Sequence, residues 1–424
     1  MKTKAIRLYG KKDLRLEEFE LPLIGSDEIL AHVISDSICM SSYKAAGQGS
    51  DHKRVPGNIS KEPVIIGHEF CGVIKEVGKK WQKKFQPGDK FSIQPALNYE
   101  HGPVGILSAP GYSYRYLGGD ATMVIIPDEV MTHDCLLPYR GEGYFPASLS
   151  EPMSCIIGAF HASYHTRAGS YVHEMGIKKN GSMAILAGAG PMGLGAIDYA
   201  LHGPDRPSLL VVTDIDDARL DRAKSLFPVK NAEDHGVKLF YTNTKKLQNP
   251  VSEMRILSGK DGFDDVMVFA PVRPVVEQAD ALLGRDGCLN FFAGPTDPEF
   301  RAELNFYNVH YNAAHITGTS GGNTDDMKES LALMAKDKIR PQVMVTHIGG
   351  LDAVIETTLN LPAIPGGKKL IYNNISLTLT AIDSFPQAGN NNPLFKNLSE
   401  ITDRNNGLWS LEAEEYLLKN APGI

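Results

Sequence analysis

The sequence predicts an α/β protein that combines a doubly wound parallel sheet with a second, barrel-like domain of short β-strands. Two patterns carry most of this prediction. From about residue 156 to 318, apolar runs of strand length alternate with helical patterns, which is typical of a parallel sheet covered by helices. Before about residue 155, short runs of alternating apolar and polar residues are separated by Gly and Pro turns, as in small β-barrels.

A glycine-rich turn opens the alternating region and is the third observation. The apolar run Met183–Ala187 leads into Gly188-Ala-Gly190-Pro-Met-Gly193, then a helical pattern and a second apolar run that ends at Asp214. Gly188 permits the tight turn, Gly190 the close approach of a pyrophosphate, and Gly193 the packing of helix on strand. A glycine turn can arise by chance, but the flanking strand, helix and acid together predict a Rossmann-type dinucleotide site.

The acid at the end of the second run bears on the choice of coenzyme. Asp214 would accept hydrogen bonds from the adenosine ribose and repel a 2′-phosphate, which favours NAD(H) over NADP(H). Arg219 follows on the next predicted helix and would soften this preference, although a solvated helix residue is the simpler interpretation, so NADP(H) stays open. The predicted cofactor-binding residues are Gly188, Gly190, Pro191, Met192, Gly193, Asp214 and Arg219.

Composition limits the classes of partner and the compartment. The 424 residues exceed one ordinary core, so we expect two domains. A net charge of −7 argues against nucleic acid or an anionic membrane as the main partner. No apolar run reaches the ~20 residues of a membrane span, and the N-terminus lacks a secretory apolar core. The five scattered cysteines do not form a disulfide framework, so a reducing cytoplasm is expected.

The predicted elements follow the chain as three segments: 1–155, a β domain; 156–322, the dinucleotide-binding domain; and 323–424, which returns to the first domain and ends in a tail. In the first segment, residues 47–62 form a polar exposed loop. Its strands are expected within Ala5–Tyr9, Leu14–Phe19, Glu28–Ser35, 63–78 and 91–93.

In the second segment, helices are expected at Ile156–Arg167, Leu194–Leu201, Asp216–Phe227, Val251–Ser258 and Pro274–Leu283, and strands at Met183–Ala187, Leu209–Thr213, Leu239–Tyr241, Asp265–Ala270, Cys288–Ala293 and His315–Gly318. In the third, they are a helix over Thr324–Lys336, strands at Val343–Ile348 and Lys368–Tyr372, a loop near residue 390 and a helix over Leu411–Leu418.

Four residues with soft and hard ligand atoms precede the dinucleotide-binding domain. They are Cys39, the pair His68-Glu69, and Glu151, and a thiolate, an imidazole and a carboxylate together suit Zn²⁺. From the residues alone the alternative stays open, because a Cys at a strand end is often a small buried hydrophobe and a His in a turn is often structural.

Several short motifs occur in the order typical of one enzyme family. The sequence resembles the polyol-dehydrogenase branch of the zinc-dependent medium-chain dehydrogenase/reductase family over roughly residues 1–375. That resemblance implies a GroES-like β-barrel domain and a Rossmann domain. The motifs are Cys39-Met-Ser-Ser, Gly67-His-Glu-Phe-Cys-Gly72, Gln86-Pro-Gly-Asp89, Glu151-Pro-Met-Ser154 and Gly188-Ala-Gly-Pro-Met-Gly193.

The resemblance assigns roles to individual residues. It implies that Cys39, His68 and Glu151 hold one catalytic zinc, with Glu69 beside it or exchanging onto the metal. Ser41 takes the place of the hydroxyl in the proton relay, although a turn or cap hydroxyl is the alternative. The family often has Asp where this chain has Ser42, so the resemblance assigns the relay only as far as Ser41.

Two further features are interpreted as structural. Many family members bind a second, structural zinc through four cysteines between about 90 and 115, and this chain has none there, so no structural zinc is expected; it has Tyr99, His101, Tyr112, Tyr114 and Arg115 instead. We interpret Tyr112 and Tyr114 as packing residues. His161 and His165, four apart on the predicted helix, resemble a metal pair. Because a zinc set is already complete, we favour the interpretation that one lines the cleft between the domains and the other ends the helix.

The implied reaction is hydride transfer between NAD(P)H and a carbonyl polarised by zinc. Stretches at 79–88, 287–295 and 318–327 narrow the resemblance to the L-sorbose-1-phosphate reductases, which form D-glucitol 6-phosphate. An unphosphorylated polyol dehydrogenase and a non-catalytic dinucleotide-binding protein are the alternatives. Family members are usually dimers or tetramers, so a homo-oligomer is expected. Candidates for binding the phosphate are Lys44, Arg54, Arg115 and Arg140.

Overall fold

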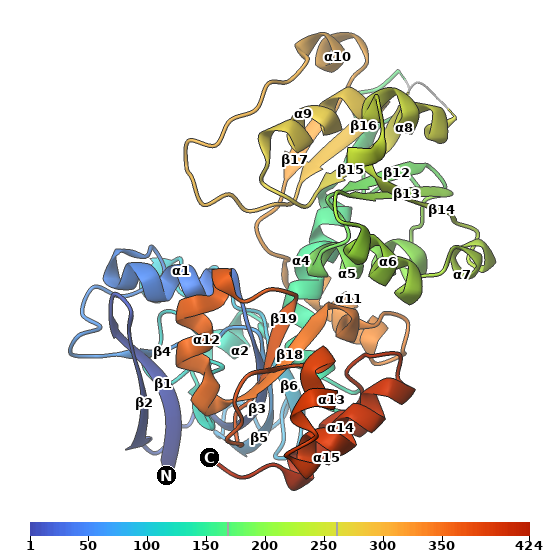
Figure 1. Ribbon diagram of the computed structural model, residues 1–424. Coiled ribbons are helices and arrows are strands. Elements are labelled where there is room, and N and C mark those ends of the chain that lie inside the picture. The colour runs from blue at the N-terminus through green and yellow to red at the C-terminus, as the bar shows by residue number, and fades with distance from the viewer. Residues whose placement is uncertain (168, 260–261) are drawn as a thin grey trace. The chain divides into compact units, whose positions relative to one another are not determined.

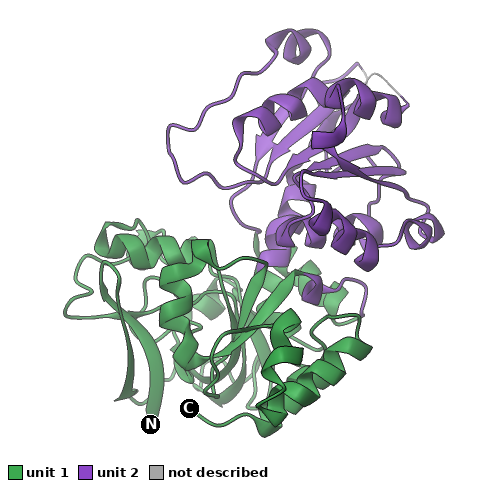
Figure 2. Cartoon of the chain, viewed as in Figure 1, with its two compact units in different colours: residues 1–151, 323–336, 344–424 green, residues 152–322, 337–343 purple. Residues whose placement is uncertain are grey.

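The computed structural model describes residues 1–167, 169–259 and 262–424, which form two compact units. Unit 1 comprises Met1–Glu151, Asn323–Lys336 and Met344–Ile424, and unit 2 comprises Pro152–Gly322 and Asp337–Val343 (Figure 2). Within the described residues, no helix is both long and apolar enough to cross a membrane.

Unit 2 is built on a six-stranded sheet in which every pairing is parallel (Figure 1). The strand order is β14-β13-β12-β15-β16-β17, so the chain starts in the middle, builds one half and crosses to the other. Every residue of β12 and β13 is buried, as expected of strands covered on both faces. The strands are β12 (Ser182–Leu186), β13 (Leu209–Asp214), β14 (Lys238–Asn243), β15 (Phe263–Val268), β16 (Leu283–Phe291) and β17 (His315–Gly318).

Helices connect these strands, and their ends follow capping chemistry. The Asp216 side chain accepts the N–H groups of Ala218 and Arg219 at the start of α6. Gly259, in the left-handed region at φ 64°, ends α8. The helices are α5 (Pro191–His202), α6 (Asp217–Leu226), α7 (Val229–Asp234), α8 (Pro250–Ser258), α9 (Arg273–Leu282) and α10 (Phe306–Tyr311); α4 (Ser150–Ala162) begins in unit 1 and continues into unit 2.

Unit 1 contains two sheets around a β-rich core. One has eight strands, in the order β20-β18-β19-β3-β5-β6-β9 with β8 also paired to β3, and the other has the order β2-β1-β4. These strands are β1 (Lys2–Gly10), β2 (Asp13–Glu20), β3 (Ile29–Ile38), β4 (Val64–Ile65), β5 (Phe70–Val77), β6 (Lys90–Ile93), β8 (Met123–Ile126), β9 (Leu136–Pro138), β18 (Val345–Gly350), β19 (Lys368–Tyr372) and β20 (Thr380–Ala381). Together with the parallel sheet of unit 2, this architecture confirms the predicted fold class.

Helices complete unit 1. They are α1 (Met40–Gln48), α2 (Asp128–Thr132), α3 (Phe145–Ser148), α11 (Thr324–Met334), α12 (Val354–Asn360), α13 (Phe385–Ala388), α14 (Pro393–Arg404) and α15 (Leu411–Asn420). The last three form the C-terminal tail, whose Trp409 is fully buried and donates its indole N–H to Tyr372 Oη at 2.8 Å. The tail is therefore an integral part of unit 1.

Three sequence-based element predictions are wrong. The helix expected over Ile156–Arg167 begins earlier and ends at Ala162, and Tyr164–Thr166 is instead strand β10, paired with β11 (His173–Met175). Consequently His161 and His165 do not share a helix. The buried His165 imidazole contacts Asp265 Oδ1 at 3.2 Å and the Asp286 carbonyl oxygen at 2.8 Å, and these two hydrogen-bond contacts hold the strand in place.

The other two differences lie in unit 1. The helix α1, directly after Cys39, and the short 3₁₀ turn Gly49–Asp51 occupy the start of the stretch expected as a loop over 47–62. In the tail, α14 was not predicted, although its apolar residues Phe395, Leu398 and Ile401 recur at helical spacing and are buried.

Candidate metal centre and dinucleotide turn

Strand pairing in unit 1 brings two distant segments of sequence together. β3 runs antiparallel to β5, with Asp36 opposite Phe70 and Ser35 opposite Cys71. The end of β3 therefore lies beside the start of β5. Cys39 follows the end of β3, and the His68-Glu69 pair comes just before β5, so all three side chains meet at one edge of the sheet.

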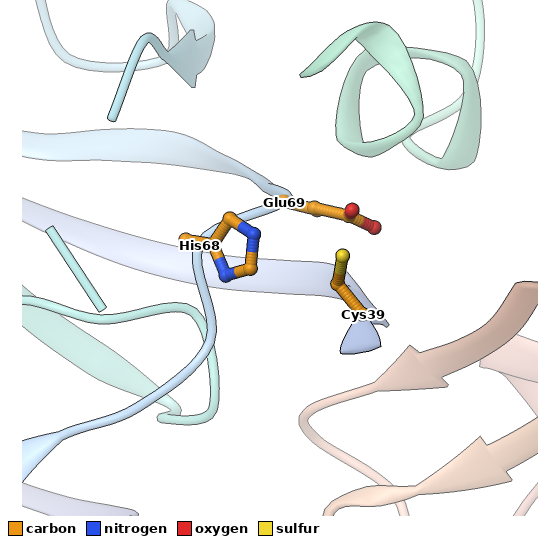
Figure 3. Close-up of side chains that lie close together, drawn as sticks. All are labelled: Cys39, His68 and Glu69. Carbon is orange, nitrogen blue, oxygen red and sulfur yellow. The ribbon is translucent and has the colours of Figure 1, made fainter. Parts of the chain in front are cut away.

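These three residues form a compact set of metal-ligand atoms. The Cys39 thiol, a His68 ring nitrogen and a Glu69 carboxylate oxygen all lie within 4.8 Å of one another (Figure 3). His68 and Glu69 are buried and Cys39 is half-buried. Sulfur, nitrogen and oxygen donors at this spacing match the ligand types that Zn²⁺ takes in catalytic sites.

The turn that carries His68 depends on glycine. Gly67 has φ 90°, a left-handed conformation, and a Cβ atom there would lie 2.6 Å from the Asp120 backbone nitrogen. Any side chain at this position would thus overlap the backbone behind the turn. The conformation of Gly67 is what allows His68 and Glu69 to follow in the observed direction.

Hydroxyl groups surround the His68 imidazole. Nε2 lies 3.2 Å from Ser41 Oγ and 3.3 Å from Tyr112 Oη, and Nδ1 lies 3.3 Å from Ser42 Oγ. Ser41 Oγ also donates to Cys39 Sγ at 3.1 Å. Ser42 can therefore orient the His68 ring by a hydrogen bond to Nδ1 and leave Nε2 for a metal. Metal-binding histidines usually have such a hydrogen-bonding partner at the other ring nitrogen.

Glu69 has a cationic partner from a remote part of the chain. Lys368 Nζ donates to both carboxylate oxygens, at 2.5 and 2.7 Å, and Ser37 Oγ donates to one of them. Burial opposes the charged form of Glu69, but Lys368 and His68 outweigh it and lower the pKa of this carboxyl. Glu69 is therefore an anion held in a fixed orientation.

Glu151 is not one of the three grouped residues, but their charges act on its carboxyl group. Burial first, and then the charge of Glu69, raise the pKa of Glu151 to about 7. Burial likewise raises the pKa of the Cys39 thiol. The Cys39 thiol and the Glu151 carboxyl are thus held toward their protonated forms, while the Glu69 carboxylate is paired with Lys368. A divalent cation would favour the ionised forms of the thiol and of Glu151, which are the forms that bind a metal. The donor set and its electrostatics both fit zinc.

The glycine turn of unit 2 has the local geometry expected of a dinucleotide site. Gly190 is the N-cap residue of α5, and a Cβ atom at Gly193 would lie 2.1 Å from the Gly188 carbonyl oxygen, so helix and turn touch. The buried Asp214 carboxylate, at the end of β13, accepts the Ala189 N–H at 3.3 Å and the Ile215 N–H at 2.8 Å. This carboxylate also fixes the turn.

The other predicted contacts of the dinucleotide occupy two helices. Pro191 and Met192 open α5, whereas Arg219 lies on α6 with an exposed side chain, 4.0 Å from Asp216. The Arg219 guanidinium is thus a solvated group beside an acid of its own helix.

Fold and site together define a class of protein: a zinc-binding dehydrogenase with one barrel-type and one Rossmann-type unit. Two family models match the chain, the alcohol dehydrogenase GroES-like domain over residues 25–135 and the zinc-binding dehydrogenase domain over 191–336. The chain belongs to the zinc-binding dehydrogenases of the medium-chain dehydrogenase/reductase family. This result confirms the family, the fold class and the zinc-dependent oxidoreductase activity predicted from the sequence.

Particular relatives cover nearly the whole chain. It is 55% identical to the mannitol-1-phosphate 5-dehydrogenase of Aliivibrio fischeri over 98% of this chain and 97% of that one. It is 50% identical to the L-sorbose 1-phosphate reductase of Klebsiella pneumoniae over 100% and 98%, and 55% identical to the uncharacterized protein YggP of Escherichia coli over 99% and 97%. Among solved structures, the 2R,3R-butanediol dehydrogenase of Bacillus subtilis has a TM-score of 0.67 at 21% identity, covering 88% of this chain and 100% of that one.

Sequence reasoning missed two residues at the metal centre. Lys368 gave no signal, because a lysine at the start of a strand is usually solvated. Tyr112 was interpreted as a packing residue, and its ring does pack, 4.9 Å from the His68 ring, but its hydroxyl also reaches His68. Tyr114, in contrast, lies in the hydrophobic core.

Proposed function

We propose that this protein transfers hydride between NAD(P)H and a ketose phosphate, with L-sorbose 1-phosphate reduced to D-glucitol 6-phosphate as the first substrate pair to test. The observation that carries the proposal is the Cys39–His68–Glu69 set of metal-ligand atoms, in a chain 50–55% identical to enzymes named for sugar and polyol phosphates. One relative is named for a mannitol phosphate and another for a sorbose phosphate. The chemistry they share is the interconversion of a hexitol phosphate and a ketose phosphate at the carbon next to the chain end.

The residues of the centre divide into ligands and supports. Cys39, His68 and Glu151 are the proposed zinc ligands, and Glu69 is positioned beside them or exchanges onto the metal. Zinc, when bound, supplies Lewis acidity toward the substrate oxygen. Lys368 holds the Glu69 carboxylate, and Ser42 orients the His68 ring, so both keep the donor set in place.

Protons reach the reacting oxygen through hydroxyl groups. Reduction consumes one hydride from the coenzyme and one proton, and yields the alcohol and the oxidised coenzyme. Ser41 Oγ, 3.1 Å from Cys39 Sγ and 3.2 Å from His68 Nε2, is the hydroxyl placed to hand over that proton. Its place among the ligand atoms favours this role over that of a simple cap hydroxyl.

The glycine turn at 188–193 is the proposed cradle for the coenzyme pyrophosphate. Asp214 supports NAD(H) as the preferred coenzyme, because its buried carboxylate stands at the strand end where a 2′-phosphate would be repelled. Assembly as a homodimer or homotetramer is part of the same proposal, as is a cytoplasmic location.

A nicotinamide absorbance assay tests the proposal. The purified protein is given NADH or NADPH with L-sorbose 1-phosphate, fructose 6-phosphate, free L-sorbose or free fructose, before and after treatment with a chelator. We expect oxidation of NADH with a phosphorylated ketose, loss of activity on chelation and recovery with Zn²⁺. Turnover of free ketoses alone would support an unphosphorylated polyol dehydrogenase, and coenzyme binding without turnover would support a non-catalytic protein.

A further inference from the structure

We propose that Lys44, His52, Lys53 and Arg54, on α1 and the segment that follows it, bind the phosphate group of the substrate. This inference rests on the proposed function. It assigns a binding site to the substrate phosphate, for which the metal centre offers no ligand. All four residues belong to unit 1, as does the metal centre.

The first argument is proximity to the metal centre through one aromatic ring. The Tyr112 ring stacks on the His52 ring at 5.7 Å and 9°, and it lies 4.9 Å from the His68 ring. A single side chain thus contacts both the candidate ligand His68 and the basic segment. In L-sorbose 1-phosphate the phosphorus is three bonds from the carbonyl carbon, so a substrate whose carbonyl reacts at the metal centre would carry its phosphate close by.

The second argument is uncompensated positive charge. Among the described residues, none of the three cations Lys44, Lys53 and Arg54 forms an ion pair with a carboxylate. The nearest acid in sequence, Asp51, is paired with Lys11 at 2.6 Å. A phosphate dianion would complement these three cations, which have no carboxylate partner.

The third argument is that the donors are held in place before any ligand binds. Arg54 donates through Nη1 to the Leu107 carbonyl oxygen at 3.0 Å, while its backbone carbonyl accepts Ser113 Oγ at 2.7 Å. His52 accepts the Arg54 backbone N–H at Nδ1, at 3.3 Å, which leaves Nε2–H as the donor of the neutral ring. Burial, and then the charges of Arg54, Lys53 and Lys44, lower the pKa of His52.

The remaining basic residues proposed from the sequence fit this role less well. Arg115 Nη1 already faces a carboxylate oxygen of Glu62 at 4.0 Å and stacks on Tyr116. Arg140 is exposed, and within the described part of the chain no hydrogen bond or ring contact joins it to His68 or Tyr112. Of the four candidates, the structure therefore favours Lys44 and Arg54, and it adds His52 and Lys53.

The test compares phosphorylated and free substrates. The variants Arg54→Gln and Lys44→Gln, singly and together, are assayed with L-sorbose 1-phosphate, fructose 6-phosphate and the free ketoses, with Arg140→Gln as the matched control. Removing an interaction that is equal in ground and transition states raises KM and leaves kcat. We expect KM for the phosphorylated ketose to rise at least about tenfold in the single variants and roughly 100-fold in the double variant, because a charged hydrogen-bonding partner is lost each time.

Three readouts separate the inference from a general structural effect. The ratio of kcat/KM for phosphorylated over free ketose should fall with each variant, Arg54→Lys should recover part of it, and Arg140→Gln should keep the wild-type ratio. Inorganic phosphate should inhibit the wild type competitively with the sugar phosphate, and the double variant much less.

Two different failures are distinguishable. If the wild type uses sugar phosphates and the variants keep its preference for them, the phosphate lies elsewhere and this inference is wrong while the proposed function stands. If the wild type uses only free ketoses and inorganic phosphate does not inhibit it, the proposed function and this inference both fail.

Discussion

The C-terminal tail makes a sharp prediction about Glu414, a buried carboxylate on α15. Its two oxygens accept the backbone N–H groups of Tyr144 at 2.7 Å and Phe145 at 2.8 Å, and the hydroxyl of Tyr372 at 2.8 Å. The two N–H groups stand at the start of α3, so Glu414 caps that helix from a remote part of the chain. Because α3 runs directly into α4, the cap also sets the position of Glu151.

The substitution Glu414→Gln keeps the shape and removes one acceptor. The amide NH₂ accepts no hydrogen bond, so at least one backbone N–H loses its partner, which costs about 1–3 kcal/mol when the group is buried. The bonds that remain lose the contribution of the negative charge, roughly another 1 kcal/mol. The free energy of unfolding should therefore fall by about 3 kcal/mol, and Tm by roughly 6–12 °C for a unit of this size.

Calorimetry and a zinc titration form the assay, with Glu415→Gln as the control, since Glu415 is the exposed neighbour on the same helix. Glu414→Gln should lower Tm and weaken zinc binding, whereas Glu415→Gln should change neither. If Glu414→Gln unfolds within about 2 °C of the wild type and binds zinc equally well, the tail does not hold α3, and the reasoning from these three hydrogen bonds is refuted.

Three further predictions concern buried charges. Because the pKa of Glu151 is raised to about 7 and a ligand must be deprotonated, zinc affinity should fall as pH decreases from 8 to 6, and Glu151→Gln should flatten this dependence in a titration series. Burial raises the pKa of Asp120 from 3.8 to about 8, so between these pH values the native state retains a proton that the unfolded chain releases, and stability falls as pH rises. The Tm of Asp120→Asn should therefore rise relative to that of the wild type as pH rises. A Tm difference between variant and wild type that does not change with pH would contradict this. Lys368→Met leaves the buried Glu69 carboxylate without its cation, so the free energy of unfolding of the zinc-free protein, measured with urea, should fall by about 3–5 kcal/mol. The zinc-loaded protein should lose less. Equal losses would argue against a zinc site that includes Glu69.

The sequence was most informative where structure is local. The six strands of the parallel sheet in unit 2 follow from their apolar spacing. Motif order predicts Cys39, His68 and Glu151 as zinc ligands with Glu69 beside them, and the structure groups Cys39 and His68 with Glu69. His165 shows the limit of such patterns. Its neighbours continue a helical spacing, yet strand pairing with β11 and the buried contacts to Asp265 and Asp286 override that local preference.

Long-range pairing decides the rest of the site. Lys368 reaches Glu69 because β19 pairs with β3, in a register that places Lys369 opposite Ile38. Glu414 reaches α3 from a tail helix, and Tyr112 reaches His68 from a loop between strands. Single residues of this kind carry no local signal, because their partners lie tens to hundreds of positions away in the chain.

The split of unit 1 between the two ends of the chain has a consequence for biosynthesis. At about 5–20 residues per second, a ribosome adds β19 roughly 20–60 s after β3. For that interval the Ser35–Ile38 part of β3 lacks the partner that β19 provides, although β8 already pairs with Ile29–His32. Most of unit 2 is synthesised in between as one continuous segment, so it can fold first. The nascent N-terminal segment, with Glu69 still lacking Lys368, must wait for Met344–Ile424 to complete unit 1. A premature stop codon even within α15 would leave this unit unfinished.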